Sequence, residues 1–168
     1  MDDPKTRRID NDYKRLVEIN KKSSLIYVEP LSEDRTYYRV TYRCKGLMKS
    51  FPSGQIIETN YHSMEIYLHR EYPRRPPRLI WLTDIFHPNI LSHLENGGVC
   101  IGKWTPMEKL DELVIRIGEM IQYKSYNVND ALNEEAKTWA RDNLSRFPVD
   151  DRPLLKIETG DKNEKITL

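Results

Sequence analysis

Three side chains capable of chemistry, His87, Asn89 and Cys100, lie close together in one irregular segment of the sequence. Gly97 and Gly98 come just before the cysteine, and because glycine has no Cβ they would let a substrate backbone approach the thiol closely. A clear β-strand pattern precedes this segment and an amphipathic helical pattern follows it. Loops held by such a rigid scaffold often carry the catalytic and binding residues of a protein.

The residues alone leave several interpretations open, and the first two are catalytic. In one, the Cys100 thiolate is a nucleophile that carries an acyl group. The side-chain NH₂ of Asn89 would then donate to the developing oxyanion, which contributes roughly 10²–10³ in rate when such a donor is well placed. In the other, Cys100, His87 and Asn89 act as a cysteine hydrolase triad. The rigid spacing across Pro88 disfavours the triad, because Asn89 must orient His87 while His87 faces the thiol.

Two further interpretations involve no catalysis. His87, His93 and Cys100 could bind zinc, although the sequence lacks the Cys-x-x-Cys spacing that is typical of structural zinc sites. Cys100 could also be an inert thiol in a structural loop, since free cysteine is among the most buried residue types. Residue types and spacing do not choose among these four interpretations.

The overall composition excludes several classes of protein. The chain has 168 residues with Lys+Arg 27 against Asp+Glu 26, and this net charge of +1 gives no reason to expect nucleic-acid binding. No apolar run approaches the roughly 20 residues that a membrane span needs. The N-terminus lacks the apolar region of a secretory signal. Only Cys44 and Cys100 are available as thiols, and nothing suggests a small disulfide-stabilised scaffold, so we expect a cytoplasmic protein.

Hydrophobic patterning predicts an N-terminal helix followed by four β-strands. From about Thr6 to Lys22 apolar residues recur at helical spacing, and many of the remaining residues are basic. Strands are predicted at 25–28, 36–44, 64–68 and 78–82. Cys44 falls on the apolar face of the second strand and is expected in the core, whereas His62 is expected at the surface. Closely spaced strands joined by short turns favour an antiparallel meander.

Two helices are predicted after the reactive segment. The first runs from about Met107 to Gln122, and its apolar face is complete enough for the central helix of the core. Asn129 or Asp130 can cap the second helix. This second helix is predicted to bury Leu132, Ala136, Trp139 and Ala140. We therefore expect an α+β fold over residues 1–148 and a partly disordered C-terminal tail over residues 149–168.

An ordered set of motifs resembles the ubiquitin-conjugating enzymes, which carry a modifier protein from an activating enzyme to a ligase. In chain order the motifs are Tyr72-Pro73-x-x-Pro76-Pro77, His87-Pro88-Asn89, Gly98-Val99-Cys100, Trp104-Thr105-Pro106 and Asn127-x-x-Asp130-Ala131-Leu132-Asn133. Each motif alone is weak, but their order matches that family from the first helix to Leu144. The resemblance implies the family's fold: an N-terminal helix, a four-stranded antiparallel meander, an active-site loop, and two or more helices after it.

The resemblance also implies a reaction at Cys100. Its thiolate would accept the C-terminal acyl group of a ubiquitin-like protein from the activating enzyme by thioester exchange. A substrate amine, usually lysine, would then attack the new thioester. Asn89 would stabilise the oxyanion or brace the loop, and Asp130 would orient the lysine and help to deprotonate it. His87 and Pro88 would support the site structurally, and neither a metal nor an organic cofactor is implied.

The implied partners are a ubiquitin-like protein, an activating enzyme, a substrate protein and a ligase. The basic face of the first helix would dock the activating enzyme through Arg7, Arg8, Lys14 and Arg15. Two loops would meet a ligase through Tyr72, Pro73, Arg74, Trp104 and Pro106. The alternative function is a non-catalytic adaptor that binds ubiquitin-like proteins, but the presence of Cys100, Asn89 and Asp130 favours the enzyme.

The sequence departs from the family's pattern on both sides of the cysteine. The loop from Asn89 to Cys100 is longer than usual for the family, and the segment from Cys100 to Trp104 is shorter. Arg74 stands where an apolar ligase contact is common. A divergent, prokaryotic conjugation system with its own ubiquitin-like protein would fit these departures.

Overall fold

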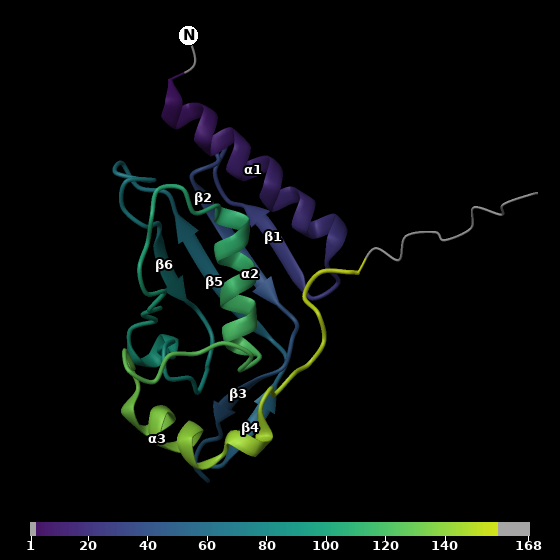
Figure 1. Cartoon of the computed structure of the whole chain (residues 1–168), viewed down its shortest axis with the longest axis vertical. Helices are drawn as coiled ribbons and strands as arrows, with labels where there is room; N and C mark the ends of the chain where they lie inside the picture. Colours follow the sequence, from purple (N-terminus) through teal and green to yellow (C-terminus); the bar gives the residue numbers. More distant parts are fainter. Residues whose placement is uncertain (1–2, 158–168) are drawn as a thin grey trace, which may run out of the picture.

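The computed structural model describes residues 3–157, and at its centre lies an antiparallel sheet (Figure 1). The sheet contains β1 (Ile26–Pro30), β2 (Tyr37–Tyr42), β5 (His62–Tyr67) and β6 (Arg78–Trp81), in that order. Each strand is antiparallel to its neighbour, which confirms the predicted four-stranded meander. Between β2 and β5 the chain makes a separate two-stranded hairpin, β3 (Gly46–Lys49) and β4 (Ile56–Thr59), which the sequence pattern had not indicated.

The helices are α1 (Pro4–Lys22), α2 (Leu110–Ile121) and α3 (Glu134–Asp142), with short 3₁₀ turns η1 (His93–Glu95) and η2 (Leu144–Arg146). The helix α2 packs on the sheet, and α1 contacts both β1 and α2 (Figure 1). The Tyr42 hydroxyl donates to the Val114 carbonyl over 2.7 Å and so ties β2 to α2. Within residues 3–157 none of the helices is both long and apolar enough to span a membrane.

The predicted alternation of buried and more exposed side chains along β2 is confirmed by their burial. Tyr38, Val40 and Tyr42 are fully buried, as period-2 patterning requires for one face of a strand. Cys44 continues the same face and is also fully buried. Burial raises the pKa of the Cys44 thiol to about 12, so this cysteine is a core residue with no thiolate at neutral pH.

The helix α3 begins later than its predicted caps. Asn133 is the N-cap, and its side chain accepts from the Ala136 N–H over 3.0 Å. Asn129 and Asp130 precede the helix in an irregular loop, and Leu132, predicted to be buried, is 44% exposed. The physical reason is a competing contact, because the Leu132 N–H donates to the Pro88 carbonyl over 2.7 Å and holds this residue outside the helix. Among the predicted core residues of this helix, Ala136 and Ala140 are buried, whereas Trp139 is only partly buried.

The described part of the C-terminal tail packs back onto the domain. Leu154 is buried, and the Ser23 hydroxyl donates to its carbonyl over 2.5 Å. The Lys156 N–H donates to the Lys22 carbonyl at the end of α1 over 2.7 Å. The rest of the tail that was expected to be partly disordered, residues 158–168, lies outside the described residues.

A buried ionic network joins α1 to a loop beside it. Asp12 is fully buried on α1, and it accepts from the Arg8 Nε over 2.8 Å and from the Tyr72 hydroxyl over 2.6 Å. Arg8 also donates to the carbonyls of Pro106 and Glu108 in the loop that precedes α2. One guanidinium on α1 therefore holds two loops in place.

Two residues predicted as partner contacts belong to this network. Tyr72 is only 1% exposed, and the Arg8 side chain is 18% exposed. The sequence predicted that both would face partner proteins, because a basic helix face and a Tyr-Pro motif carry no information on burial. The structure instead places both side chains in internal contacts that brace the surface loops.

The substitution Tyr72→Phe should lower the free energy of unfolding by about 2 kcal/mol, because it removes a hydrogen bond to a buried carboxylate without opening a cavity. Burial, together with the charge of Asp12, raises the pKa of Tyr72, so the native hydroxyl remains a donor throughout the working pH range. Urea denaturation measures the change. Tyr27→Phe, at a position 58% exposed, is the matched control and should change stability by less than about 0.5 kcal/mol. Equal effects of the two substitutions would contradict the proposed importance of the network.

Candidate active site

Backbone hydrogen bonds close the segment from Asn89 to Cys100 into a loop with a narrow base. The Cys100 N–H donates to the Asn89 carbonyl over 2.9 Å, and the Leu91 N–H donates to the Gly98 carbonyl over 2.8 Å. Gly97 has φ 70°, and a Cβ there would lie 2.6 Å from the Trp81 carbonyl oxygen, so no larger residue fits this approach to β6. The base of the loop thus fixes the thiol beside Asn89, while η1 lies at its far end.

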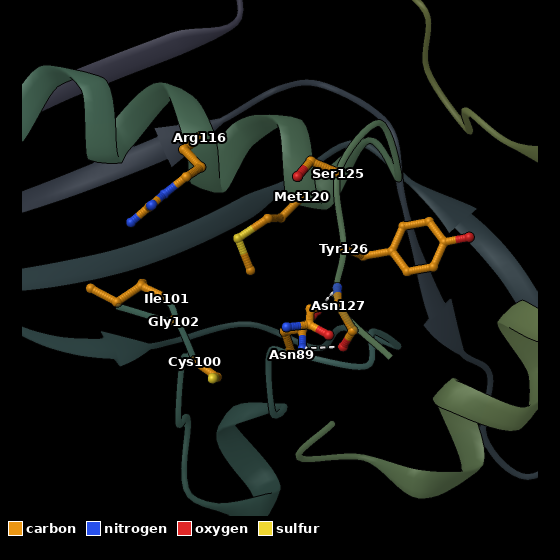
Figure 2. A pocket seen from close by; sticks show the side chains of 9 residues that line it. All are labelled: Asn89, Cys100, Ile101, Gly102, Arg116, Met120, Ser125, Tyr126 and Asn127. Atoms are coloured by element: carbon orange, nitrogen blue, oxygen red, sulfur yellow. Dashed lines mark hydrogen bonds between the residues drawn. The ribbon is translucent and has the colours of Figure 1, made fainter. Parts of the chain in front are cut away.

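The Asn89 side chain clamps a second loop onto the first. It is only 2% exposed, and its Nδ2 donates to the Asn127 carbonyl over 2.7 Å while its Oδ1 accepts from the Asn127 N–H over 2.8 Å (Figure 2). Nδ2 also donates to the Asp130 carbonyl over 3.3 Å. All these partners are backbone groups, so the amide fixes the path of residues 127–130 regardless of their side chains.

His87 is sequestered within the protein. Its Nδ1 accepts from the Asn89 N–H over 3.0 Å, and its Nε2 lies 2.8 Å from the Met120 carbonyl, so the tautomer protonated on Nε2 satisfies both contacts. Burial lowers the pKa of His87 to about 3. With both ring nitrogens engaged and no tendency to take up a proton, His87 is not placed to activate Cys100, and this geometry gives no support to a hydrolase triad.

The zinc interpretation likewise finds no support in the arrangement of these side chains. Within the part of the chain that the structure describes, no three His, Cys, Asp or Glu residues gather as ligands for a metal. His93 lies on η1 beside Asp84, with its Nδ1 3.5 Å from the carboxylate, at the end of the loop away from Cys100.

Cys100 lies half-buried at the edge of a surface pocket of about 210 Å³. The pocket is lined by Asn89, Cys100, Ile101, Gly102, Arg116, Met120, Ser125, Tyr126 and Asn127. Figure 2 shows Arg116 and Met120 reaching from α2 toward the segment that carries the thiol, whereas the Tyr126 ring points away from it. A narrow chain could enter between α2 and residues 100–102 and bring a reacting carbonyl to the sulfur.

Asp130 lies close to this pocket without lining it. Its side chain is exposed, and its Oδ2 accepts from the Asn127 Nδ2 over 3.1 Å. The Asp130 carbonyl accepts from the Asn89 Nδ2, and the Asn89 carbonyl accepts from the Cys100 N–H. The structure therefore brings Cys100, Asn89 and Asp130 together through consecutive hydrogen bonds, although Asp130 comes from a distant part of the chain.

Two residues of the site, Asn127 and Arg116, were not predicted from the sequence. Asn127 appeared only as part of a motif, yet its backbone supplies two of the three partners of the Asn89 amide. Arg116 borders the apolar face of α2 one turn before Met120, and it lines the pocket with its guanidinium paired to Glu108 over 2.8 Å. A charged residue next to the apolar face of α2 was the available signal.

The remaining residues predicted to meet partners are at the surface. Arg7, Lys14, Arg74 and Pro106 are exposed, and Arg15, Pro73 and Trp104 are partly buried. The Trp104 Nε1 donates to the Pro73 carbonyl over 2.9 Å, so the two predicted ligase loops are joined to each other. Both loops lie at the α1 end of the molecule, where the Arg8 network fixes them.

An α+β fold with a meander sheet and a cysteine loop clamped by an asparagine is the architecture that the motifs had implied, and comparison with known proteins agrees. A family model described as ubiquitin-conjugating enzyme matches residues 8–150. The chain belongs to the ubiquitin-conjugating enzyme family.

Curated relatives carry the same family name. Ubiquitin-conjugating enzyme E2 S of Homo sapiens is 30% identical over 139 residues, covering 80% of this chain and 57% of the relative. Ubiquitin-conjugating enzyme E2 2 of Kluyveromyces lactis is 24% identical over 151 residues, covering 88% of this chain and 84% of the relative. The chain thus spans little more than half the length of the human relative.

The protein should lose stability as the pH falls below about 6.5, because two histidines are buried in neutral form. Contrary to the sequence prediction, His62 is fully buried, and burial lowers its pKa to about 4, as it lowers that of His87 to about 3. Below pH 6.5 these two histidines bind protons in the unfolded chain but remain neutral in the folded protein. The contribution of each neutral histidine to the free energy of unfolding is therefore complete above pH 6.5. As the pH falls, this contribution is lost at up to about 1.4 kcal/mol per pH unit for each histidine, down to about pH 4 for His62 and about pH 3 for His87.

Urea denaturation between pH 7 and pH 4.5 measures this slope. His87→Gln should make it shallower by about one proton, whatever its effect on stability at pH 7. Leu94→Ser, at a position 79% exposed, removes no titrating group and is the control that should leave the slope unchanged. An identical slope in wild type and His87→Gln would show that His87 takes up its proton in the folded state.

Proposed function

We propose that this chain carries a ubiquitin-like protein as a thioester on Cys100 and transfers it to a lysine amine. The observation that supports this best is the consecutive hydrogen bonding from Cys100 to Asn89 to residues 127–130, which places a thiol and an amide at one pocket with a carboxylate beside it. Membership of the ubiquitin-conjugating enzyme family is consistent with it. Because the thiol must remain reduced, we place the reaction in the cytoplasm.

Loading is a thioester exchange. The Cys100 thiolate attacks the carbonyl carbon of the modifier's C-terminal thioester on the activating enzyme, and that enzyme's cysteine leaves as a thiolate. The pocket between α2 and residues 100–102 would receive the modifier's C-terminal segment. Since the incoming acyl group is already activated, this step needs no general base, which agrees with the sequestered ring of His87.

Discharge transfers the acyl group to nitrogen. A neutral lysine amine attacks the thioester carbonyl, the tetrahedral intermediate expels the Cys100 thiolate, and an isopeptide bond remains. We assign to Asp130 the orientation of the lysine and the acceptance of its proton, because its carboxylate is exposed and held by Asn127.

We assign to Asn89 chiefly the bracing of this loop. Its NH₂ group donates to the carbonyls of both Asn127 and Asp130, so both of its protons have backbone acceptors. Stabilising an oxyanion would require one of these bonds to be exchanged during the reaction. Losing the side chain would also leave the Asn127 N–H without its partner, and the Asp130 carbonyl without its donor.

Surface contacts complete the proposal. We assign Arg7, Lys14 and Arg15 to the activating enzyme, and Pro73, Arg74, Trp104 and Pro106 to a ligase, while Arg8 and Tyr72 support these surfaces from inside.

Incubating the protein with ATP, an activating enzyme and its ubiquitin-like protein should yield a thioester adduct that reducing thiols cleave by exchange, the reducible adduct. Cys100→Ser should remove the reducible adduct or replace it with a more reductant-stable ester, as seen by gel electrophoresis with and without thiol. Cys44→Ala is the matched control and should load as wild type does, because the Cys44 thiol is buried and protonated. A reducible adduct that persists in Cys100→Ala would contradict the proposal, whereas binding of the modifier without any adduct would favour the adaptor function.

The substitution Asp130→Ala should load normally yet discharge to free lysine more slowly, near the roughly 10²-fold lower end of general-base contributions. Single-turnover discharge of the purified thioester measures this rate. Glu134→Gln removes a neighbouring exposed carboxylate and should leave the rate unchanged. Equal discharge rates in wild type and Asp130→Ala would exclude Asp130 from the mechanism.

A further inference from the structure

A second groove lies at the end of the molecule opposite α1, between the β3–β4 hairpin, η1 and the start of α3 (Figure 1). It has a volume of about 220 Å³. It is lined by Lys49, Phe51, Asp84, Ile85, Phe86, Ser92, Leu94, Glu95, Asn133 and Glu135. None of these residues lines the pocket at Cys100.

The two edges of this groove present large apolar side chains to solvent. Phe51 in the β3–β4 turn is 95% exposed and Leu94 on η1 is 79% exposed, although burying either side chain would be favourable. The floor between them is formed by Ile85 and Phe86, which are 6% and 3% exposed. Apolar side chains that border a hollow with an apolar floor are typical of an interaction site.

Both edges are held in place by hydrogen bonds. In the β3–β4 turn, the Ser50 N–H donates to the Gln55 carbonyl over 2.7 Å and the Gly54 N–H donates to the Ser50 carbonyl over 2.8 Å. On the opposite edge, the Ser92 hydroxyl donates to Asp84 over 3.1 Å. Because these exposed side chains stand on fixed backbone, a ligand would bind with little ordering cost.

The charge of the groove selects the chemistry of its ligand. Three carboxylates, Asp84, Glu95 and Glu135, line it against one lysine, Lys49, whose Nζ lies 2.6 Å from Glu135. Among the described residues Glu95 forms no ion pair. An apolar groove with surplus negative charge fits a segment that carries a bulky apolar side chain next to Lys or Arg.

Leu132 links this groove to the loop that carries the thiol. Asn133, which lines the groove, follows Leu132, and a Cβ on Gly98 would lie 3.8 Å from Leu132 Cδ1. Gly98 is two positions before Cys100, and Asp130 is two positions before Leu132. A chain lying in the groove could therefore extend along Leu132 toward Asp130 and Cys100.

We infer that this groove binds the substrate protein, through a segment in which a bulky apolar residue is followed by basic residues and, at a short distance, by the acceptor lysine. This inference rests on the proposed function and names its substrate class. The activating enzyme and the ligase are assigned to surfaces at the α1 end, which leaves this end free for a third protein.

Binding to the unloaded protein tests the inference without any thioester chemistry. The probes are fluorescent peptides containing Leu-Arg-Arg, with glycine-serine spacers of varied length before a single acceptor lysine, and matched peptides with Leu-Glu-Glu. Fluorescence anisotropy should show that wild type prefers the basic peptides and that this preference weakens with salt. Phe51→Ser combined with Leu94→Ser should weaken binding at least roughly tenfold. Met107→Ser, at a position 89% exposed, is the matched control and should bind as wild type does.

Charge reversal supplies the complementary measurement. Glu95→Lys should weaken binding of the basic peptides and strengthen binding of the acidic ones, since it changes an exposed side chain that supports no other described contact. Discharge of the Cys100 thioester to the basic peptides should fall in the same variants, while loading and discharge to free lysine remain unchanged.

Absence of basic-peptide binding by wild type, or equal binding by wild type and the groove variants, would overturn the inference. A dimer in wild type that dissociates in Phe51→Ser would also overturn it, by assigning the groove to a second copy of the chain. Failure of the proposed function is distinguishable, because it would abolish the reducible adduct while leaving peptide binding to the groove intact.

Discussion

The amide of Asn89 is the contact on which the arrangement of the site depends. It lies buried between two segments with no regular secondary structure, and all its hydrogen bonds go to backbone groups of residues 127–130. An unpaired buried polar group costs about 1–3 kcal/mol, so these partners hold each other firmly. The Pro88 carbonyl adds a second attachment by accepting from the Leu132 and Asn133 N–H groups. The start of α3 and the position of Asp130 follow from these few bonds.

Burial decides which chemically capable side chains remain available. Of the two cysteines, Cys44 lies in the core with a raised pKa, whereas Cys100 reaches a pocket. Of the nearby imidazoles, His87 uses both nitrogens to join the cysteine loop to the end of α2. A hydrolase would need that ring as a base, but a carrier of an activated acyl group would not. The same burial that removes a base from the site therefore makes the thioester chemistry the better match.

The sequence predicts much of the fold because regular elements bury one face at a fixed period. Tyr38, Val40 and Tyr42 alternate into the core, and α2 lies where its apolar stripe indicated. Periodicity fails where tertiary contacts override local preference. Leu132 is drawn out of α3 by the Pro88 carbonyl, His62 is buried against Gly46 and Trp81, and Arg8 and Tyr72 point inward to Asp12. The sequence motifs identified Cys100, Asn89 and Asp130 as candidates. Only the folded structure shows that hydrogen bonds to backbone groups connect them.

The two ends of the molecule are held by different sets of hydrogen bonds, and the proposed function assigns them to different partners. At the α1 end, Asp12, Arg8 and Tyr72 fix the loops proposed to meet enzymes of the pathway. At the other end, the loop that carries η1 is closed at its base by the Asn89 and Cys100 backbones. A loop closed in this way can change its length and side chains at the tip with little entropic cost and without moving the thiol. In the proposed function, exposed residues such as Leu94 and Glu95 contact the substrate, while the base of the same loop holds the thiol in place.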